Sequence, residues 1–195
     1  NLAKAYFFDR FISIDESTRN YETIIDNNGI IKNTIDNCSF HLLNNGTKVE
    51  NFVFNYLDYL LWRDYQFNKK WFNEEKLKRI RDPRISKYEF GFRSSVEHYY
   101  PQQPNKEAGF SDLKKEYLDC FGNLCLLSSS KNSRLSNLSP KQKKDFYFQS
   151  ETIDSIKQCL MMDYNNWWED EIKEHGSLMN EILLEQYTKD KEIDA

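Results

Sequence analysis

Residues 88–102, YEFGFRSSVEHYYPQ, contain the stretch on which the fold of this chain depends. Aromatic residues occupy every second position from 88 to 92, and this two-residue period predicts a strand that leads into Val96, Glu97 and His98. A short apolar run, Leu124–Leu127, predicts a second strand. The two runs indicate a small hairpin inside a chain whose remaining sequence is mainly helical.

Helical patterns cover most of the chain outside the hairpin. Apolar residues recur every three or four positions between residues 49 and 65, as in an amphipathic helix that packs on a core. Ser139 and Pro140 form a favourable helix start before residues 141–148. Further helices are predicted over residues 2–14, 73–80, 152–162 and 165–187, and the Asn-rich stretch 15–48 predicts loops and a candidate hairpin. The predicted fold class is α+β, mostly helical.

The length and composition are those of one globular domain. The chain has 195 residues, of which 39% are hydrophobic and 15% aromatic. We expect one domain over residues 1–195, with helical support in 1–85, the hairpin and its helix in 86–148, and C-terminal helices in 149–195. No apolar run approaches the roughly 20 residues that cross a bilayer, so no membrane association is expected. Because the sequence opens at Asn1 in helix-like sequence, we expect a fragment that lacks an N-terminal domain.

The four cysteines indicate neither a disulfide framework nor a zinc site. The chain has no Cys-x-x-Cys pair, and no histidine stands at ligand spacing beside a cysteine. Buried free thiols are the simpler interpretation of Cys38, Cys120, Cys125 and Cys159. Together with the missing secretion signal they predict a cytoplasmic protein, and no zinc is expected.

Three short segments carry residue types suited to phosphodiester chemistry. They are residues 96–102, VEHYYPQ; residues 121–127, FGNLCLL; and residues 131–137, KNSRLSN. Each is weak alone, because a Glu-His pair occurs by chance in many proteins and a lone histidine is more often structural than catalytic. His41 and His175 lack such neighbours, and we interpret them as structural or surface residues.

Together the three segments resemble the signature of HNH nucleases, the His-Me finger or ββα-metal superfamily. In that signature an acidic residue and a histidine precede a proline at the first strand, Asn-Leu opens the second strand, and a His or Asn lies in the next helix. More narrowly, FRSSVEHYYPQ, FGNLCLLSSSKNSRLSN and KQKKDFY are similar to the C-terminal nuclease domain of GmrSD-type modification-dependent (type IV) restriction endonucleases. The similarity spans Phe90 to Tyr147 and implies a small ββα-metal core embedded in helices.

The resemblance implies a role for each matching residue. His98 is the expected general base that activates water, because an imidazole can accept a proton near neutral pH. Glu97 and Asn132 are the expected ligands of one divalent cation, and their hard oxygen donors suit Mg²⁺ or Mn²⁺. Asn123 is expected to pin the loop between the strands and to orient His98, with a simple turn residue as the alternative. Since neighbours on a strand face opposite sides, the strand is expected to end or bend at Glu97 and His98.

The charge distribution is uneven along the chain. The net charge is -4, but residues 169–195 alone carry nine acids and three bases, whereas residues 131–144 carry five bases and no acid. A basic run is usually a solvated surface, but beside the metal-site helix it predicts contacts with DNA phosphates. The expected contact residues are Lys131, Arg134, Lys141, Lys143 and Lys144.

The sequence therefore predicts a metal-dependent DNA endonuclease of a restriction or phage-defence system. By resemblance, its partners would be DNA, with modified phage DNA as one candidate, and a nucleotide-binding and sensing domain N-terminal to this chain; a homodimer is a further candidate. One alternative is a nucleic-acid-binding or regulatory module that keeps the HNH fold without catalysis. The other is an RNA-directed nuclease of the same fold.

Overall fold

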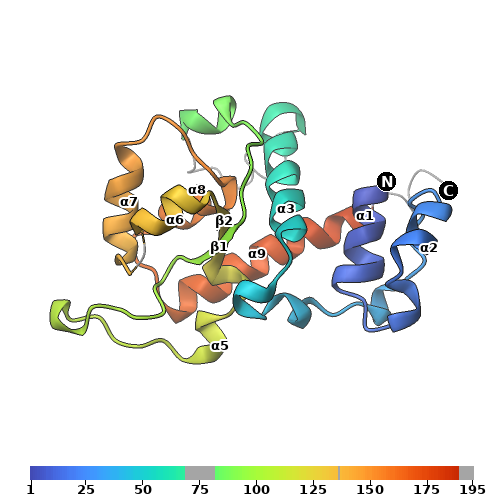
Figure 1. The fold of residues 1–195 in the computed structure, drawn as a ribbon, viewed down its shortest axis with the longest axis horizontal. Coiled ribbons are helices and arrows are strands. Elements are labelled where there is room, and N and C mark those ends of the chain that lie inside the picture. The colour runs from blue at the N-terminus through green and yellow to red at the C-terminus, as the bar shows by residue number, and fades with distance from the viewer. Residues whose placement is uncertain (69–81, 136, 189–195) are drawn as a thin grey trace.

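Helices surround one small antiparallel hairpin in the computed structural model of the chain, which describes residues 1–68, 82–135 and 137–188 (Figure 1). Strand β1 (Ser95–His98) pairs with β2 (Leu124–Leu127), and the register places Ser95 opposite Leu127 and His98 opposite Leu124. All four residues of β2 are buried, because apolar side chains on both of its faces pack into the core. The predicted α+β, mostly helical class is confirmed at this level.

Helices lie within or near the predicted stretches 2–14, 49–65, 141–148, 152–162 and 165–187, whereas two short helices, over residues 21–26 and 115–118, were not predicted. The α-helices are α1 (Leu2–Tyr6), α2 (Tyr21–Asp26), α3 (Asn51–Arg63), α5 (Lys115–Leu118), α6 (Ser129–Leu135), α7 (Pro140–Phe148), α8 (Ile156–Met162) and α9 (Glu169–Thr188). Two π-helical segments continue α1 and α3, over Phe7–Phe11 and Asp64–Asn68. Short 3-10 turns cover Glu16–Thr18, Ile35–Asn37, Phe40–Leu43, Gly46–Lys48, Pro83–Lys87, Lys106–Ala108 and Phe121–Asn123.

Helix α7 begins where its sequence predicts. The Ser139 hydroxyl accepts a hydrogen bond from the backbone N–H of Gln142, and the Gln142 side chain accepts one from the Ser139 N–H. Pro140 fills the first turn, where its missing N–H costs nothing. This capping box sets the direction in which α7 leaves the connection from α6.

Three expectations for secondary structure need correction. Residues 88–94 form no strand, because β2 ends at Leu127 and offers no backbone partner beyond the bond from the Ser94 N–H to the Leu127 carbonyl. Residues 15–48 contain the helix α2 and short 3-10 turns rather than loops and a hairpin, with one isolated bridge between Ser13 and Cys38 in the part of the chain that the structure describes. Helix α8 begins only at Ile156, where Ser155 caps it, and the helix predicted over 73–80 lies outside the described residues.

The Asp58 carboxylate of α3 ties the segment before β1 to the start of α8. Arg93 Nη1 lies 2.5 Å from Asp58 Oδ2, and both side chains are buried. Asp58 Oδ1 accepts hydrogen bonds from the Lys157 N–H at 2.9 Å and the Ser155 hydroxyl at 3.3 Å. Because a buried charge is tolerated only when it is paired and hydrogen-bonded, this carboxylate fixes where β1 enters the core.

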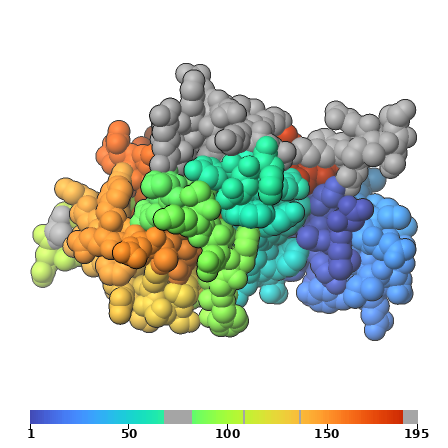
Figure 2. Space-filling view, turned by 90° about the horizontal axis from the view of Figure 1, so that it is seen from above, coloured from blue at the N-terminus to red at the C-terminus, as the bar shows by residue number. Residues whose placement is uncertain are grey.

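Helix α9 runs beneath the hairpin and packs against α3 and the 3-10 turn that precedes β2 (Figure 1). The core extends from Phe7 to Leu183, and the space-filling view shows the N-terminal helices at one end of the molecule and α6 and α7 toward the other (Figure 2). All four cysteines are free, and burial raises the pKa of the Cys125 thiol to about 12. No helix in the described part of the chain has the length and apolar character that crossing a membrane requires.

A glycine contact sets the distance between α9 and the hairpin. A Cβ added to Gly122 would lie 2.0 Å from the Ile172 carbonyl oxygen and 3.0 Å from the Gly176 nitrogen. Both obstacles are backbone atoms of α9, so neither can rotate away. The turn before β2 therefore approaches α9 more closely than any other residue type would permit.

We expect Gly122→Ala to lower the free energy of unfolding by about 1–3 kcal/mol, because the added methyl forces the turn away from α9. Urea denaturation followed by circular dichroism measures it. The matched control is Gly91→Ala, since no atom lies within 4 Å of a Cβ there. Equal stability of the two variants would contradict the close approach.

Candidate active site

The first half of the candidate site lies on one face of β1. Side chains alternate along a strand, so Ser95 and Glu97 share a face and stand about 6.5 Å apart along it. The Asn132 amide of α6 donates a hydrogen bond from Nδ2 to the Ser95 hydroxyl. The hairpin and α6 therefore bring Glu97 and Asn132 to the same face, although no hydrogen bond joins them directly.

A buried lysine occupies one oxygen of the Glu97 carboxylate. Lys143 Nζ from α7 lies 2.7 Å from Glu97 Oε1 and donates a second hydrogen bond, at 2.6 Å, to the His98 carbonyl. The Lys143 side chain is 0% exposed and that of Glu97 is 13% exposed. Burial lowers the pKa of Lys143 from its usual value, and the Glu97 carboxylate opposes this effect. This burial is at odds with the expected phosphate contact from Lys143.

His98 ends β1 and faces the other side of the hairpin. Its Nε2 lies 3.0 Å from Asp119 Oδ1, next to the end of α5. Among the described residues no other group hydrogen-bonds the imidazole, so Nδ1 is left without a protein partner. The strand does end at this pair, as expected, but it remains regular through both residues, and no described contact joins the imidazole to Glu97 or Asn132.

Gly46 explains how Asp119 comes close to the hairpin. Gly46 has a φ of +56°, and its N–H donates to the Asp119 carbonyl at 3.1 Å. A Cβ there would lie 2.7 Å from Asp119 Oδ1, the atom that His98 contacts. The positive φ and missing side chain of Gly46 therefore leave space for the carboxylate that orients the histidine.

Asn123 hydrogen-bonds the segment that follows His98. Its Oδ1 accepts from the Tyr100 N–H at 2.8 Å and from Trp167 Nε1 at 3.0 Å, while Nδ2 donates to the carbonyls of Tyr100 at 3.2 Å and Leu118 at 3.0 Å. Its backbone carbonyl accepts from the Tyr99 N–H at 2.8 Å. Asn123 is fully buried, so these contacts make it a connecting residue rather than a simple turn residue.

The predicted phosphate-contacting residues divide into two groups. Arg134 and Lys141 are exposed and Lys144 is half-buried, so their charges reach solvent. Lys131 instead lies 2.7 Å from Asp154 Oδ1 and donates to the Thr152 carbonyl at 3.1 Å. The cations open to a ligand thus come from α6 and α7, beside the Glu97 face of the hairpin.

Three residues that the sequence analysis did not single out make hydrogen bonds within the candidate site. Asp119 holds His98, Ser95 holds Asn132, and Asp154 accepts from the Ser128 N–H at 2.9 Å at the start of α6. Ser95 lies inside the FRSSVEHYYPQ segment, whereas Asp119 and Asp154 lie outside the quoted motifs, where no sequence signal marks them. Of the remaining histidines, His41 is exposed, whereas His175 is buried against Trp167 and burial holds its pKa well below the usual value.

Glu97 and Asn132 each have a side-chain oxygen of the hard type that Mg²⁺ and Mn²⁺ prefer. Glu97 Oε2 and Asn132 Oδ1 accept no hydrogen bond from the described residues, because Lys143 takes Oε1 and the Asn132 amide turns Nδ2 to Ser95. Among those residues no group of three or more His, Cys, Asp or Glu side chains could hold a metal ion. The donor set therefore suits Mg²⁺ or Mn²⁺, which keep several waters, better than a softer ion.

Comparison with known proteins defines the class of this domain as that of restriction-type nucleases. The family model described as GmrSD restriction endonucleases, C-terminal domain, matches residues 34–182. The chain belongs to this family, as its motifs predict. Searches of curated proteins and of solved structures found no match.

We expect Lys143→Met to lower the free energy of unfolding by about 3–5 kcal/mol, because it leaves the Glu97 carboxylate without its buried partner. Thermal and urea denaturation measure the change. Lys144→Met, at the neighbouring half-buried position, is the matched control and should change stability by less than about 0.5 kcal/mol. A Lys143 variant as stable as the control would contradict the ion pair.

We also expect Asn123→Ala to lower the free energy of unfolding by at least about 2 kcal/mol, because several buried partners lose their hydrogen bonds. The exposed Asn137→Ala provides the control. Urea denaturation measures both, and a shift in the indole ¹H NMR signal of Trp167 reports the lost contact to Oδ1. An unchanged indole signal would contradict that contact.

Proposed function

We propose that this chain is the catalytic domain of a metal-dependent DNA endonuclease of the HNH type, acting in a restriction or phage-defence system. One observation carries the proposal: the first strand of the hairpin ends in Glu97-His98, with Asn132 of α6 held at the Glu97 face and Asp119 held at His98 on the opposite face of the strand end. Membership in a restriction endonuclease family supports it.

In this proposal His98 is the general base that takes a proton from the attacking water. With its N–H at Nε2 directed to Asp119, the imidazole keeps the lone pair of Nδ1 for the incoming proton. Asp119 also favours the positively charged ring that forms after the transfer, as the carboxylate partner of a catalytic histidine does in general. Gly46 and Asn123 act indirectly, through Asp119 and through the backbone after His98.

Glu97 and Asn132 are the proposed ligands of one Mg²⁺ or Mn²⁺ ion. A bound divalent cation would stabilise the negative charge that develops on the scissile phosphate and the leaving oxygen. Lys143 holds the Glu97 carboxylate by Oε1 and leaves Oε2 without a hydrogen bond from the described residues. Arg134, Lys141 and Lys144 would contact phosphates and position a duplex without reading its sequence.

The wider context is part of the same proposal. The substrate would be DNA inside the cytoplasm, with modified phage DNA as one candidate. A nucleotide-binding and sensing domain N-terminal to this chain would select it, and a homodimer would allow both strands to be cut.

The ion pair on Glu97 also favours a second function, a nucleic-acid-binding or regulatory module without catalysis. Lys143 neutralises the carboxylate, and the His98 side chain is only 5% exposed. Such a module would bind nucleic acid through Arg134 and the α7 lysines and would need no metal. A folded wild-type chain that binds DNA but shows no cleavage with either metal would favour this function.

We expect His98→Ala to reduce the rate of plasmid nicking at least ~100-fold in Mg²⁺ or Mn²⁺, since general bases contribute about that much. Gel electrophoresis of supercoiled plasmid over time gives the rate. His41→Ala is the matched control, because His41 is an exposed histidine on a short 3-10 turn away from the motif. Equal rates for the His98 and His41 variants would refute the catalytic role.

A comparison of cleavage rates on two substrates distinguishes a DNA endonuclease from the RNA-directed alternative. We expect labelled duplex DNA to be cleaved faster than single-stranded RNA of the same length under the same metal concentration. If RNA were cleaved faster, and if His98→Ala abolished that cleavage, the proposed substrate would be RNA and the proposed catalytic site would stand.

A further inference from the structure

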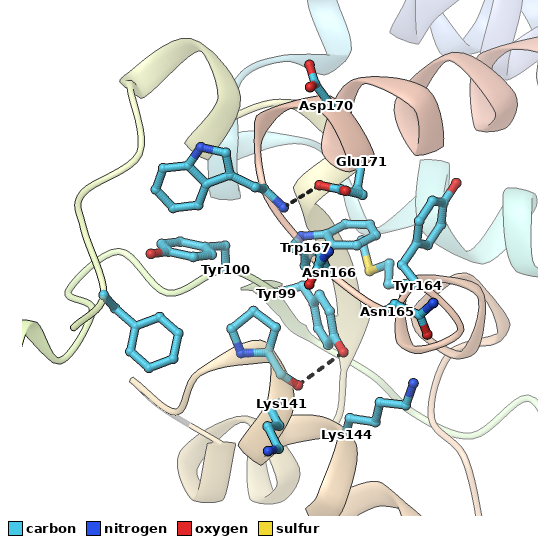
Figure 3. A pocket seen from close by; sticks show the side chains of 14 residues that line it. Tyr99, Tyr100, Lys141, Lys144, Tyr164, Asn165, Asn166, Trp167, Asp170 and Glu171 are labelled. Atoms are coloured by element: carbon cyan, nitrogen blue, oxygen red, sulfur yellow. Dashed lines mark hydrogen bonds between the residues drawn. The ribbon is translucent and has the colours of Figure 1, made fainter. Parts of the chain in front are cut away.

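A pocket of about 590 Å³ opens beside the hairpin (Figure 3). Its walls come from the segment after β1, the start of α7 and the connection between α8 and α9. A pocket of this size accommodates a small molecule or one nucleotide. Neither the proposed base nor the proposed metal ligands line it, so it is distinct from the catalytic groups.

Aromatic rings form the middle of the pocket, and other parts of the protein hold them in place. Tyr99 and Trp167 meet edge to face at 5.1 Å, and Tyr100 and Trp168 meet in the same way at 5.2 Å. The Tyr99 hydroxyl donates to the Pro140 carbonyl at 3.2 Å, and Trp167 Nε1 donates to Asn123. Trp168 is 39% exposed, so it is the ring that a flat ligand can cover.

Opposite charges stand at the two ends of these rings. Lys141 and Lys144 lie at one end, and Asp170 and Glu171 lie at the other (Figure 3). Glu171 Oε2 also accepts a hydrogen bond from the Trp168 N–H at 2.9 Å, which fixes that carboxylate. A matching ligand needs an anionic group at one end, a flat apolar middle, and hydrogen-bond donors at the other end.

Two exposed amides add hydrogen-bonding groups to the pocket wall. Asn165 and Asn166 lie between α8 and α9, and their side chains make no hydrogen bond with the described residues. An asparagine amide presents a donor and an acceptor together, and can pair with the edge of a base. The wall thus offers recognition groups that the protein itself does not use.

We propose that this pocket binds one nucleotide of the nucleic-acid substrate, with its base on Trp168, its phosphate at Lys141 and Lys144, and its amino groups toward the acidic end. This rests on the proposed function for the identity of the substrate. The anionic phosphate and the amino groups of a nucleotide are complementary to the charges at the two ends of the pocket, and base stacking on aromatic rings is the common way in which proteins hold an unpaired base.

The position of the pocket connects it to the proposed chemistry. Tyr99 and Tyr100 directly follow His98, and Lys144 directly follows Lys143, which holds Glu97. Asn123 hydrogen-bonds both Tyr100 and Trp167. A base in the pocket would therefore belong to a nucleotide close to the scissile phosphate, and it would have to leave the duplex stack to enter.

The test measures binding of fluorescein-labelled single-stranded 12-mers by fluorescence anisotropy in EDTA, where no cleavage occurs. One probe carries bases, and a second has the same sugar-phosphate length without bases. We expect Trp168→Ala to weaken binding of the base-carrying probe by about 5- to 150-fold, the usual range for one stacked base, and to leave the abasic probe unchanged. Trp168→Phe should retain most of the affinity.

Two further variants make the outcome specific. Tyr59→Ala removes a similarly exposed ring, 41% against 39%, from α3 and should change neither affinity. Lys144→Ala should weaken both probes equally, because it removes a phosphate contact. Equal losses on both probes in Trp168→Ala, or no loss on either, would overturn the proposal, as would wild-type binding that does not distinguish the probes.

The two proposals fail separately in these experiments. If binding depends on the bases and on Trp168 but the chain cleaves nothing, the proposed nuclease function is refuted and the proposed nucleotide pocket stands. If cleavage requires His98 but the two probes bind equally well, the proposed nucleotide pocket is refuted and the proposed nuclease function stands.

Discussion

The hydrogen bonds of the buried Asn123 amide are the interactions on which the candidate active site and the aromatic pocket both depend. It connects the chain leaving β1, the end of α5 and the connection before α9 through Tyr100, Leu118 and Trp167. Every donor and acceptor of the amide is used, so any displacement of these segments would leave a polar atom unpaired in the core. The residue thereby couples the backbone after His98 to the wall on which a ligand would rest.

Buried arginine and lysine side chains perform a similar connecting role around the hairpin. Arg93 meets Asp58 before β1, Lys143 meets Glu97 within β1, and Lys157 donates to the Phe121 carbonyl at 2.8 Å and the Leu124 carbonyl at 2.6 Å. Such groups contribute little net stability compared with apolar residues, but they tolerate few alternative arrangements. Contacts from α3, α7 and α8 thus hold the hairpin in position. No cluster of metal-binding side chains contributes among the described residues.

Local patterns predicted the elements of the fold better than the contacts of the site. The apolar run of β2, the period of α3 and the Ser139-Pro140 start of α7 depend on nearby residues, and all three are confirmed. The aromatic alternation at 88–92 has a strand period but finds no partner strand among the described residues, and only pairing makes a strand. Lys143 has the sequence context of a surface lysine, yet the turn of α7 directs it into the core.

The sequence by itself determined the residue types of the site, their order along the chain and the family to which the chain belongs. Only the tertiary structure decided that Asp119 orients His98, that Lys143 pairs with the Glu97 carboxylate, and that residues from three segments form one pocket. The physical reason is sequence separation: these contacts join residues 21 to 68 positions apart, and no local period encodes which distant side chains meet.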